Sequence, residues 1–211
     1  MTDVRQQISA VRRSVGSRVL EAGTARVSTI SQVYDTDVDD LWDAVTNAER
    51  IPRWFLPISG ELQPGGQYQL EGNAGGTVER CDKPTGFAAT WEYGGEVSWI
   101  EVKLTPLDEG RTRFELEHVA HVDDERWAEF GPGATGVGWD MGLLGLAGYV
   151  GSAGTAVRPE DAMTWLVSED GRLFTTLSSD AWCDANVAAG AEPDAARAAA
   201  ERTTAAYTAT P

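Results

Sequence analysis

The sequence predicts an α+β protein in which an antiparallel sheet packs on one long helix, and three observations support this prediction. Between 67 and 118, apolar and polar residues alternate in short runs separated by glycine and proline, which is typical of antiparallel strands with one buried face. Around 136–150, two apolar stripes follow one helix, so we expect most of its sides to be buried. Four apolar residues near the start follow one helical face: Val38, Leu41, Trp42 and Val45.

The first 25 residues are expected to form an N-terminal arm. Apolar residues recur there at helical spacing as far as Val19, which predicts a short helix ending near Gly23. The arm carries four arginines against two acidic residues, so it is basic in an otherwise acidic chain. Such an arm packs on the body of the protein or docks on a partner, and the sequence leaves both open.

Two short helices are predicted after a strand that ends near Tyr34. Thr36 and Asp39 have the spacing of a helix-start signal, which places the first helix at 38–46, with Trp42 in the core. The second helix, over 48–54, leads into Trp54 and Phe55.

Along the later strands, apolar and polar residues alternate, so every second side chain is expected to point into the protein and the others to point outward. The outward residues are mostly charged and are expected to form a solvated surface without chemistry. His118 is the sharpest titratable candidate, because alternation points it inward, whereas His121 has the opposite parity. The candidate inward residues with large side chains are Tyr68, Phe87, Trp91, Phe114 and His118.

Helical patterns dominate after His121. A turn or two of helix is expected at 124–130, and Gly131-Pro132-Gly133 must end it before the long helix begins. Asp140 in the long helix is expected to be a helix-start or surface carboxylate, or alternatively a partner of His118. From about 153 to 211 we expect a C-terminal helical extension, with Pro159 at a first helical position and a further helix after Pro193.

Several motifs together resemble one known superfamily. They are the hairpin Gly60-Glu61-Leu62-Gln63-Pro64-Gly65-Gly66-Gln67-Tyr68, the strand Thr90-Trp91-Glu92-Tyr93, the final hairpin from Val102 to His118, and Gly131-Pro132-Gly133 leading to Gly138-Trp139-Asp140. They are similar to motifs of the SRPBCC (START-like, helix-grip) superfamily, in its branch of bacterial homologues of the activator of the Hsp90 ATPase. The resemblance implies a helix-grip domain over 26–152, with a curved sheet wrapped around the long helix.

What the resemblance implies for function is a cavity between the sheet and the long helix that binds a hydrophobic or amphipathic small molecule. The residues expected to line it are Trp54, Phe55, Tyr68, Phe87, Trp91, Phe114, His118, Trp139 and Leu143. Each of these side chains has an alternative as plain core packing.

Two other functions stay open. The superfamily also includes polyketide cyclases and aromatases, and an enzyme of that kind would use His118 as acid or base. A co-chaperone or stress-response protein is the third reading, suggested by the name of the branch. Small-molecule binding is preferred, since the sequence has no G-x-S-x-G elbow, P-loop or dinucleotide fingerprint.

The amino-acid composition limits the kinds of molecule that the protein is expected to bind. With 33 acidic and 17 basic residues the net charge is −16, which disfavours nucleic acids and anionic membranes. Cys81 and Cys183 are far apart and form no zinc motif, so we expect reduced thiols in a cytoplasmic protein without metal or cofactor. We expect no secretory signal and no membrane insertion, because the longest apolar stretch, at 137–150, is short and rich in glycine. A homodimer or a protein partner stays open.

Overall fold

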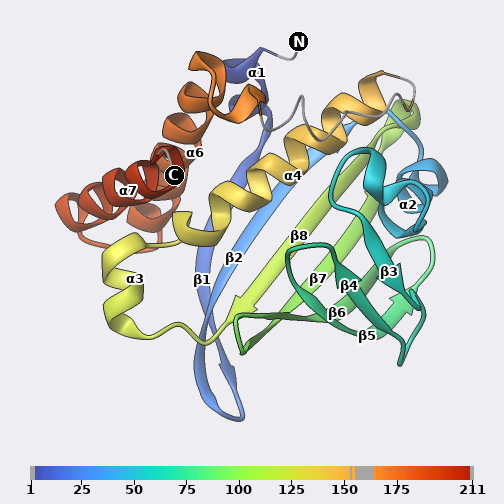
Figure 1. Ribbon diagram of the computed structural model, residues 1–211, viewed down its shortest axis with the longest axis horizontal. Helices are drawn as coiled ribbons and strands as arrows, with labels where there is room; N and C mark the ends of the chain where they lie inside the picture. Colours follow the sequence, from blue (N-terminus) through green and yellow to red (C-terminus); the bar gives the residue numbers. More distant parts are fainter. Residues whose placement is uncertain (1–2, 153, 155–163, 210–211) are drawn as a thin grey trace. The chain divides into compact units, whose positions relative to one another are not determined.

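A computed structural model describes residues 3–152, 154 and 164–209, and its elements are helices and antiparallel strands (Figure 1). The first half comprises α1 (Val4–Ala10), β1 (Arg12–Leu20), β2 (Gly23–Tyr34), α2 (Val38–Thr46), η1 (Ile51–Arg53), β3 (Ile58–Gly60), β4 (Gln67–Leu70) and β5 (Gly75–Asp82). The second half comprises β6 (Gly86–Tyr93), β7 (Glu96–Pro106), η2 (Asp108–Gly110), β8 (Thr112–Ala120), α3 (Asp124–Phe130), α4 (Gly133–Gly151), α6 (Glu169–Ala188) and α7 (Pro193–Thr208).

The strands form one sheet in the order β1-β2-β8-β7-β6-β5-β4-β3. From β3 to β8 each strand pairs with its sequence neighbour in antiparallel fashion. No strand occurs after residue 160 within the described part of the chain. The predicted α+β class, the antiparallel sheet and the long helix after residue 133, α4, are therefore confirmed.

The chain folds as two compact units. The first unit combines residues 1–30, 121–144 and 158–211, and the second combines 31–120 and 145–157. The first holds α1, β1, α3, α6 and α7, whereas the second holds α2 and the strands from β3 to β8. The expected division at residues 25 and 152 stays a prediction.

In the second unit, α2 begins at Val38 as the sequence predicts, but its cap is Asp37 and not the predicted pair of Thr36 and Asp39. Asp37 caps the helix by accepting a hydrogen bond from the backbone N–H of Asp40, and the Thr36 hydroxyl donates to the carboxylate of Asp40. α2 packs on β7 and buries Trp42, which is 5% exposed and makes an edge contact with Phe87. The helix predicted over 48–54 is shorter than expected, because only Ile51–Arg53 form a 3₁₀ turn.

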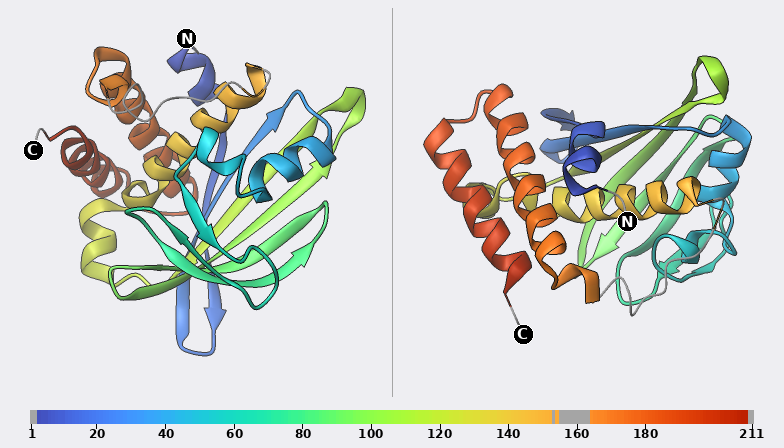
Figure 2. Two further views of the ribbon diagram at one scale, coloured as in Figure 1. Left: turned by 45° about the vertical axis from the view of Figure 1, so that its right-hand side comes forward. Right: turned by 90° about the horizontal axis from the view of Figure 1, so that it is seen from above.

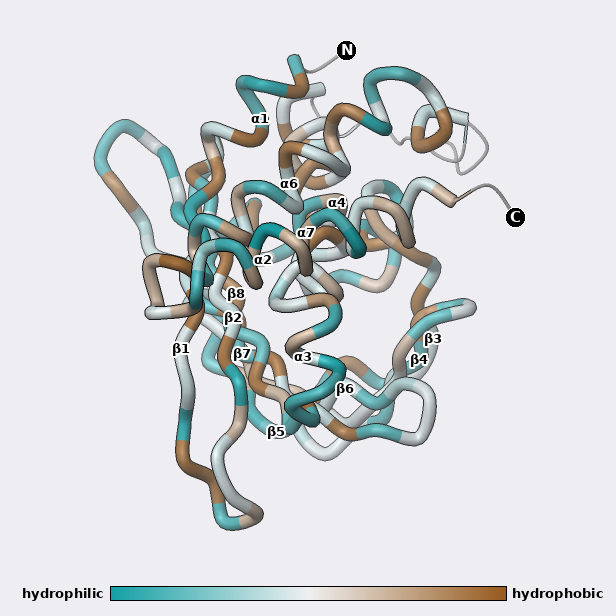
Figure 3. The backbone as a smooth tube through the Cα atoms, turned by 90° about the vertical axis from the view of Figure 1, so that its left-hand side faces the viewer, coloured by the Kyte–Doolittle hydropathy of each residue, from teal (hydrophilic) through white to brown (hydrophobic). Residues whose placement is uncertain are grey.

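In the first unit, the N-terminal arm is only partly helical. The helix stops at Ala10, and Arg12–Leu20 forms β1, so the helix predicted to reach Gly23 is wrong beyond its first turns. Arg13 and Val15 are less exposed than the residues on either side of them, which is the alternation of a strand, and Gly16 disfavours a helix interior. Figure 3 shows hydrophilic residues interrupting hydrophobic ones along β1.

The C-terminal extension is helical, as predicted. The helices α6 and α7 pack side by side, and α6 also contacts α1 and β1 (Figure 2). The helix predicted after Pro193 is confirmed as α7, with Glu192 as its N-cap. The helix start predicted at Pro159 lies outside the described residues.

Candidate binding face of the sheet

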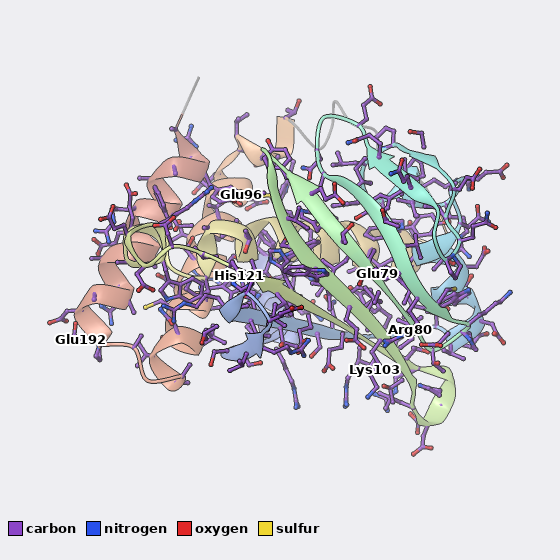
Figure 4. The ribbon with its side chains drawn as sticks, turned by 90° about the horizontal axis from the view of Figure 1, so that it is seen from below. Glu79, Arg80, Glu96, Lys103, His121 and Glu192 are labelled. Carbon is purple, nitrogen blue, oxygen red and sulfur yellow. The ribbon has the colours of Figure 1, made fainter. Side chains whose placement is uncertain are left out.

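Strand register in the second unit defines one apolar face of β6, β7 and β8. Residues directly opposite one another on it form the rows Phe87–Val102–Leu116, Ala89–Ile100–His118 and Trp91–Ser98–Ala120, with Leu104 and Phe114 beside them. We call this the inner face, and α2 lies on it through the contact of Trp42 with Phe87. The opposite, outer face carries Glu101, Lys103, Arg113, Glu115 and Glu117; Lys103 and the neighbouring Arg80 are marked in Figure 4.

Burial along the inner face is uneven. Ala89, Ile100 and Leu104 are at most 7% exposed, as expected for core residues. Phe87 and Trp91 have the same parity yet are only half-buried. Large aromatic side chains that keep accessible surface beside fully buried neighbours are typical of residues at the edge of a space, and less so of residues inside packed core.

Two other predicted wall residues are more enclosed. Phe114 is 4% exposed and stands opposite Leu104. Tyr68 is 9% exposed, and its hydroxyl donates a 2.7 Å hydrogen bond to the Thr90 carbonyl oxygen. Burial first, and the charge of Glu92 second, raise the pKa of the Tyr68 phenol, so it stays protonated at neutral pH.

His118 lies within the inner face and is 6% exposed. Its Nε2 is 2.9 Å from Ser98 Oγ, and the Ser98 hydroxyl donates to the Trp91 carbonyl oxygen. Because that hydroxyl proton is already used, Nε2 carries the hydrogen of the neutral ring and donates to Ser98. Burial lowers the pKa of His118 to about 4, so at neutral pH the ring is uncharged. His121 is exposed, as its parity predicts.

Trp54 and Phe55 form a second aromatic group in the same unit. Their rings stack with centroids 5.5 Å apart and planes 28° apart, and both side chains are half-buried. The indole N–H of Trp54 donates to the Ala44 carbonyl oxygen at 2.9 Å, which ties the pair to α2. Gly145 of α4 lies so close to the Trp54 carbonyl oxygen that a Cβ there would collide with it.

A polar network that the sequence did not reveal lies beside this pair. Arg50 Nε donates to the Tyr149 hydroxyl at 2.8 Å, and its Nη1 donates to Asp40 Oδ1 and Asp43 Oδ2, each at 2.9 Å. Its guanidinium carbon also lies 5.3 Å from the centre of the Tyr149 ring. The network joins α2, the segment after it and the C-terminal end of α4.

The network shifts the pKa of each carboxylate. Burial raises the pKa of Asp40, but hydrogen bonds from Thr36 and Arg50 outweigh it and leave that pKa lowered. The hydrogen bond from Arg50 lowers the pKa of Asp43, helped by one from Asn47. Both carboxylates are therefore ionised at neutral pH.

The remaining predicted wall residues, Trp139 and Leu143, belong to the first unit, on the N-terminal part of α4, and both are buried. Between them in sequence, Asp140 is 1% exposed. It accepts hydrogen bonds from Arg13 Nη2 at 2.6 Å and Nε at 2.9 Å, and from Ser178 and Trp182. The expectation of a helix-start or surface carboxylate is wrong, because Asp140 lies within α4 and forms a buried ion pair.

The described residues contain neither a metal-binding cluster nor a membrane-spanning helix. Among the described residues, no three His, Cys, Asp or Glu side chains are grouped closely enough to hold a metal ion. In the same part of the chain, no helix combines the length and apolar character that crossing a bilayer requires.

Comparison with known proteins shows which family the chain resembles. The family model of "Activator of Hsp90 ATPase homolog 1-like protein" matches residues 35–151. The crystal structure of CalU16 from Micromonospora echinospora is 35% identical, with 80% of this chain and 98% of that chain covered and a TM-score of 0.59. The solution structure of CalU16 gives 32% identity, 86% and 97% coverage, and a TM-score of 0.70.

A more distant structure supports the fold alone. MLL2253 from Mesorhizobium loti is 18% identical, with 60% of this chain and 98% of that chain covered and a TM-score of 0.54. A comparison with curated proteins gave no match. Together with the antiparallel sheet, these similarities confirm the predicted helix-grip fold.

Proposed function

Since the chain belongs to the family of activator of Hsp90 ATPase homolog 1-like proteins, we propose that it binds a hydrophobic or amphipathic small molecule against the inner face of its sheet. The observation that carries the proposal is the half-burial of Phe87 beside the buried Val102 and Leu116 of its own row, together with the half-buried Trp91 on the same face. Stacked, half-buried Trp54 and Phe55 add aromatic surface in the same unit. Predominantly apolar and aromatic surface with few polar groups is what small-molecule sites have in common.

The polar groups of the inner face suggest the character of the ligand. Ser98 and His118 are the polar side chains of its three rows, and His118 is uncharged at neutral pH. A face without charge favours a neutral molecule, because a buried ion would lack a partner. The net charge of −16 adds repulsion against anionic ligands.

Binding is favoured over catalysis by the state of His118. A general base works best when its pKa lies near the working pH, and a pKa of about 4 makes this imidazole a weak base at neutral pH. A bacterial, cytoplasmic setting is part of the proposal, and the free thiols of Cys81 and Cys183 suit a reducing compartment.

The test uses phenylnaphthylamine, an uncharged dye whose emission rises in apolar surroundings. We expect the native protein to bind it, and Trp91→Ala to weaken binding about tenfold, the equivalent of one lost aromatic contact. Trp99→Ala is the matched control, because Trp99 is a half-buried tryptophan on the adjacent strand but on the outer face. Absence of dye binding by the folded native protein, or equal loss in both variants, would refute the proposal.

A further inference from the structure

The segment 47–57 connects α2 to β3 and carries the aromatic pair. Its backbone is ordered locally by hydrogen bonds from the N–H groups of Arg50 and Ile51 to the Asn47 carbonyl oxygen, and from those of Trp54 and Phe55 to the Ile51 carbonyl oxygen. These bonds shape a turn, and a hydrogen bond from the Glu71 N–H to the Pro57 carbonyl oxygen ties the end of the segment to the residue after β4. The placement of the turn against α2 and α4 comes from side-chain and close-packing contacts.

Three side-chain or close-packing contacts provide that placement. Arg50 reaches back to Asp40 and Asp43 of α2 and across to Tyr149 of α4. The Trp54 indole donates to the Ala44 carbonyl oxygen, and the backbone of Trp54 lies against Gly145. The side chain of Arg50 by itself reaches both helices with hydrogen bonds.

We propose that Arg50 is a positioning residue for the binding site, which holds segment 47–57 against α2 and α4 so that Trp54 and Phe55 form a fixed wall for the ligand. The inference rests on the proposed function. It extends that function because Arg50, which is not part of the inner face, is given a role in ligand binding.

The geometry explains why an arginine is needed. The planar guanidinium donates from Nε to the phenol and from Nη1 to two carboxylates, while its face lies near the Tyr149 ring. A lysine keeps the positive charge but has a single donor atom and cannot span these partners together. Because both carboxylates are about half exposed, the ion pairs add little to global stability, and their main effect is local order.

A wall that is already ordered loses less entropy when the ligand binds, and loosening it speeds release of the ligand. The first experiment measures dissociation of phenylnaphthylamine by stopped flow in the native protein, Arg50→Lys and Tyr149→Phe. We expect each variant to release the dye about three- to tenfold faster, as the loss of one hydrogen bond implies, with a nearly unchanged association rate. The double variant should release the dye hardly faster than either single variant, because both changes break the same hydrogen bond between Arg50 and Tyr149.

Arg80→Lys is the matched control. Arg80 pairs with Asp82 and Glu101 at 2.7 and 2.6 Å, so the same chemical change breaks a similar two-carboxylate network on the outer face. It should leave dye kinetics unchanged. If the native protein binds dye and Arg50→Lys releases it at the native rate, the positioning role is wrong while the proposed function stands. If the native protein binds no dye, the proposed function itself fails.

A second experiment tests the positioning role without any ligand. Hydrogen exchange of the Trp54 and Phe55 amides should be faster in Arg50→Lys and Tyr149→Phe, while that of the β6–β7 pairs stays native. Gly145→Ala should have the same local effect, since its new Cβ pushes on the Trp54 carbonyl oxygen. Native exchange at Trp54 and Phe55 in both polar variants would overturn the inference.

Discussion

Two arginines bind residues of α4 in opposite surroundings, and the contrast shows how burial changes the role of an ion pair. Arg13 meets Asp140 in the first unit, with side chains only 4% and 1% exposed. Arg50 meets Asp40 and Asp43 in the second unit, where its own side chain is 19% exposed and theirs are 46% and 51%. Both networks use several donors of one guanidinium, so the number of hydrogen bonds does not distinguish them.

The two networks differ in their access to water. Removing Arg13 and Asp140 from water is costly, and the structure offsets that cost by giving both carboxylate oxygens donors from Arg13, Ser178 and Trp182. A single change there leaves a buried charge unpaired. Around Arg50, water can replace the donors that the half-exposed Asp40 and Asp43 lose, although the hydroxyl of Tyr149, a residue 2% exposed, also loses a donor, so the penalty is smaller than at Asp140. Four predictions follow from burial in the two units, and those at Asp140 and Arg50 test this contrast directly.

The largest effect is expected for Asp140→Ala. It leaves the Arg13 guanidinium buried without its anion and deprives Ser178 and Trp182 of their acceptor. We expect a loss of about 3–5 kcal/mol in the free energy of unfolding, the usual range for breaking a buried pair. Urea denaturation followed by circular dichroism measures it.

The double variant Arg13→Met/Asp140→Leu is the control. If desolvation dominates, replacing both ions with apolar groups should recover most of the loss seen in Asp140→Ala. A double variant as unstable as the single one would show that the unpaired charge is not what sets the stability, and that the lost attraction or the unsatisfied Ser178 and Trp182 donors set it instead.

The second prediction concerns pH. The folded-state pKa of His118 is about 4, below the ordinary 6.5, so the unfolded chain binds the extra proton first as pH falls. Stability from this group is therefore full above about pH 6.5 and falls by about 3 kcal/mol as pH drops toward 4. Unfolding free energies measured at intervals across that window give the slope.

His118→Phe should flatten this slope, whereas the same change at exposed His121 should keep it. Asp40 and Asp43 also lose stability as pH falls, because their pKa values are lowered, but most of that loss comes below their ordinary value of 3.8, and only its beginning overlaps the acid end of the window. A slope that survives in His118→Phe would mean that other groups titrate in this window.

The third prediction compares two glycines of α4. A Cβ at Gly136 would run into the Trp182 ring, which is fully buried and donates to Asp140, whereas a Cβ at Gly148 meets nothing within 4 Å. Gly136→Ala should destabilise by about 1–3 kcal/mol through overpacking. Gly148→Ala should stabilise by up to about 1 kcal/mol, as expected for alanine in a helix. Thermal melts of the two variants should shift in opposite directions.

Local patterns explain how much the sequence could predict. Apolar periodicity predicted the bounds of α2, although the helix is capped by Asp37 and not by the predicted pair of Thr36 and Asp39. Strand parity correctly placed Phe87 and His118 on the face of Ile100. The same reasoning failed for β1, where valines at helical spacing also fit a strand.

The polar networks were beyond local patterns. Arg13 and Asp140 are 127 residues apart, and Arg50 and Tyr149 are 99 apart, so nothing in either neighbourhood marks the partner. Arg50 stands next to a predicted helix in an acidic chain, where an arginine has many possible carboxylates. Which one it meets depends on how the chain returns through α4, and only the fold supplies that information.

The smallest effect is expected for Arg50→Met, and it sharpens the contrast most. The change removes the same number of guanidinium donors as a change at Arg13, but its partners Asp40 and Asp43 remain in contact with water. We expect a loss of at most about 1 kcal/mol in the free energy of unfolding, measured by urea denaturation at neutral pH. Burial would not be the deciding variable if Arg50→Met cost as much as Asp140→Ala. If the loss is small while exchange at Trp54 and Phe55 still rises, stability and local order are separated, and the half-exposed network serves the wall rather than the fold.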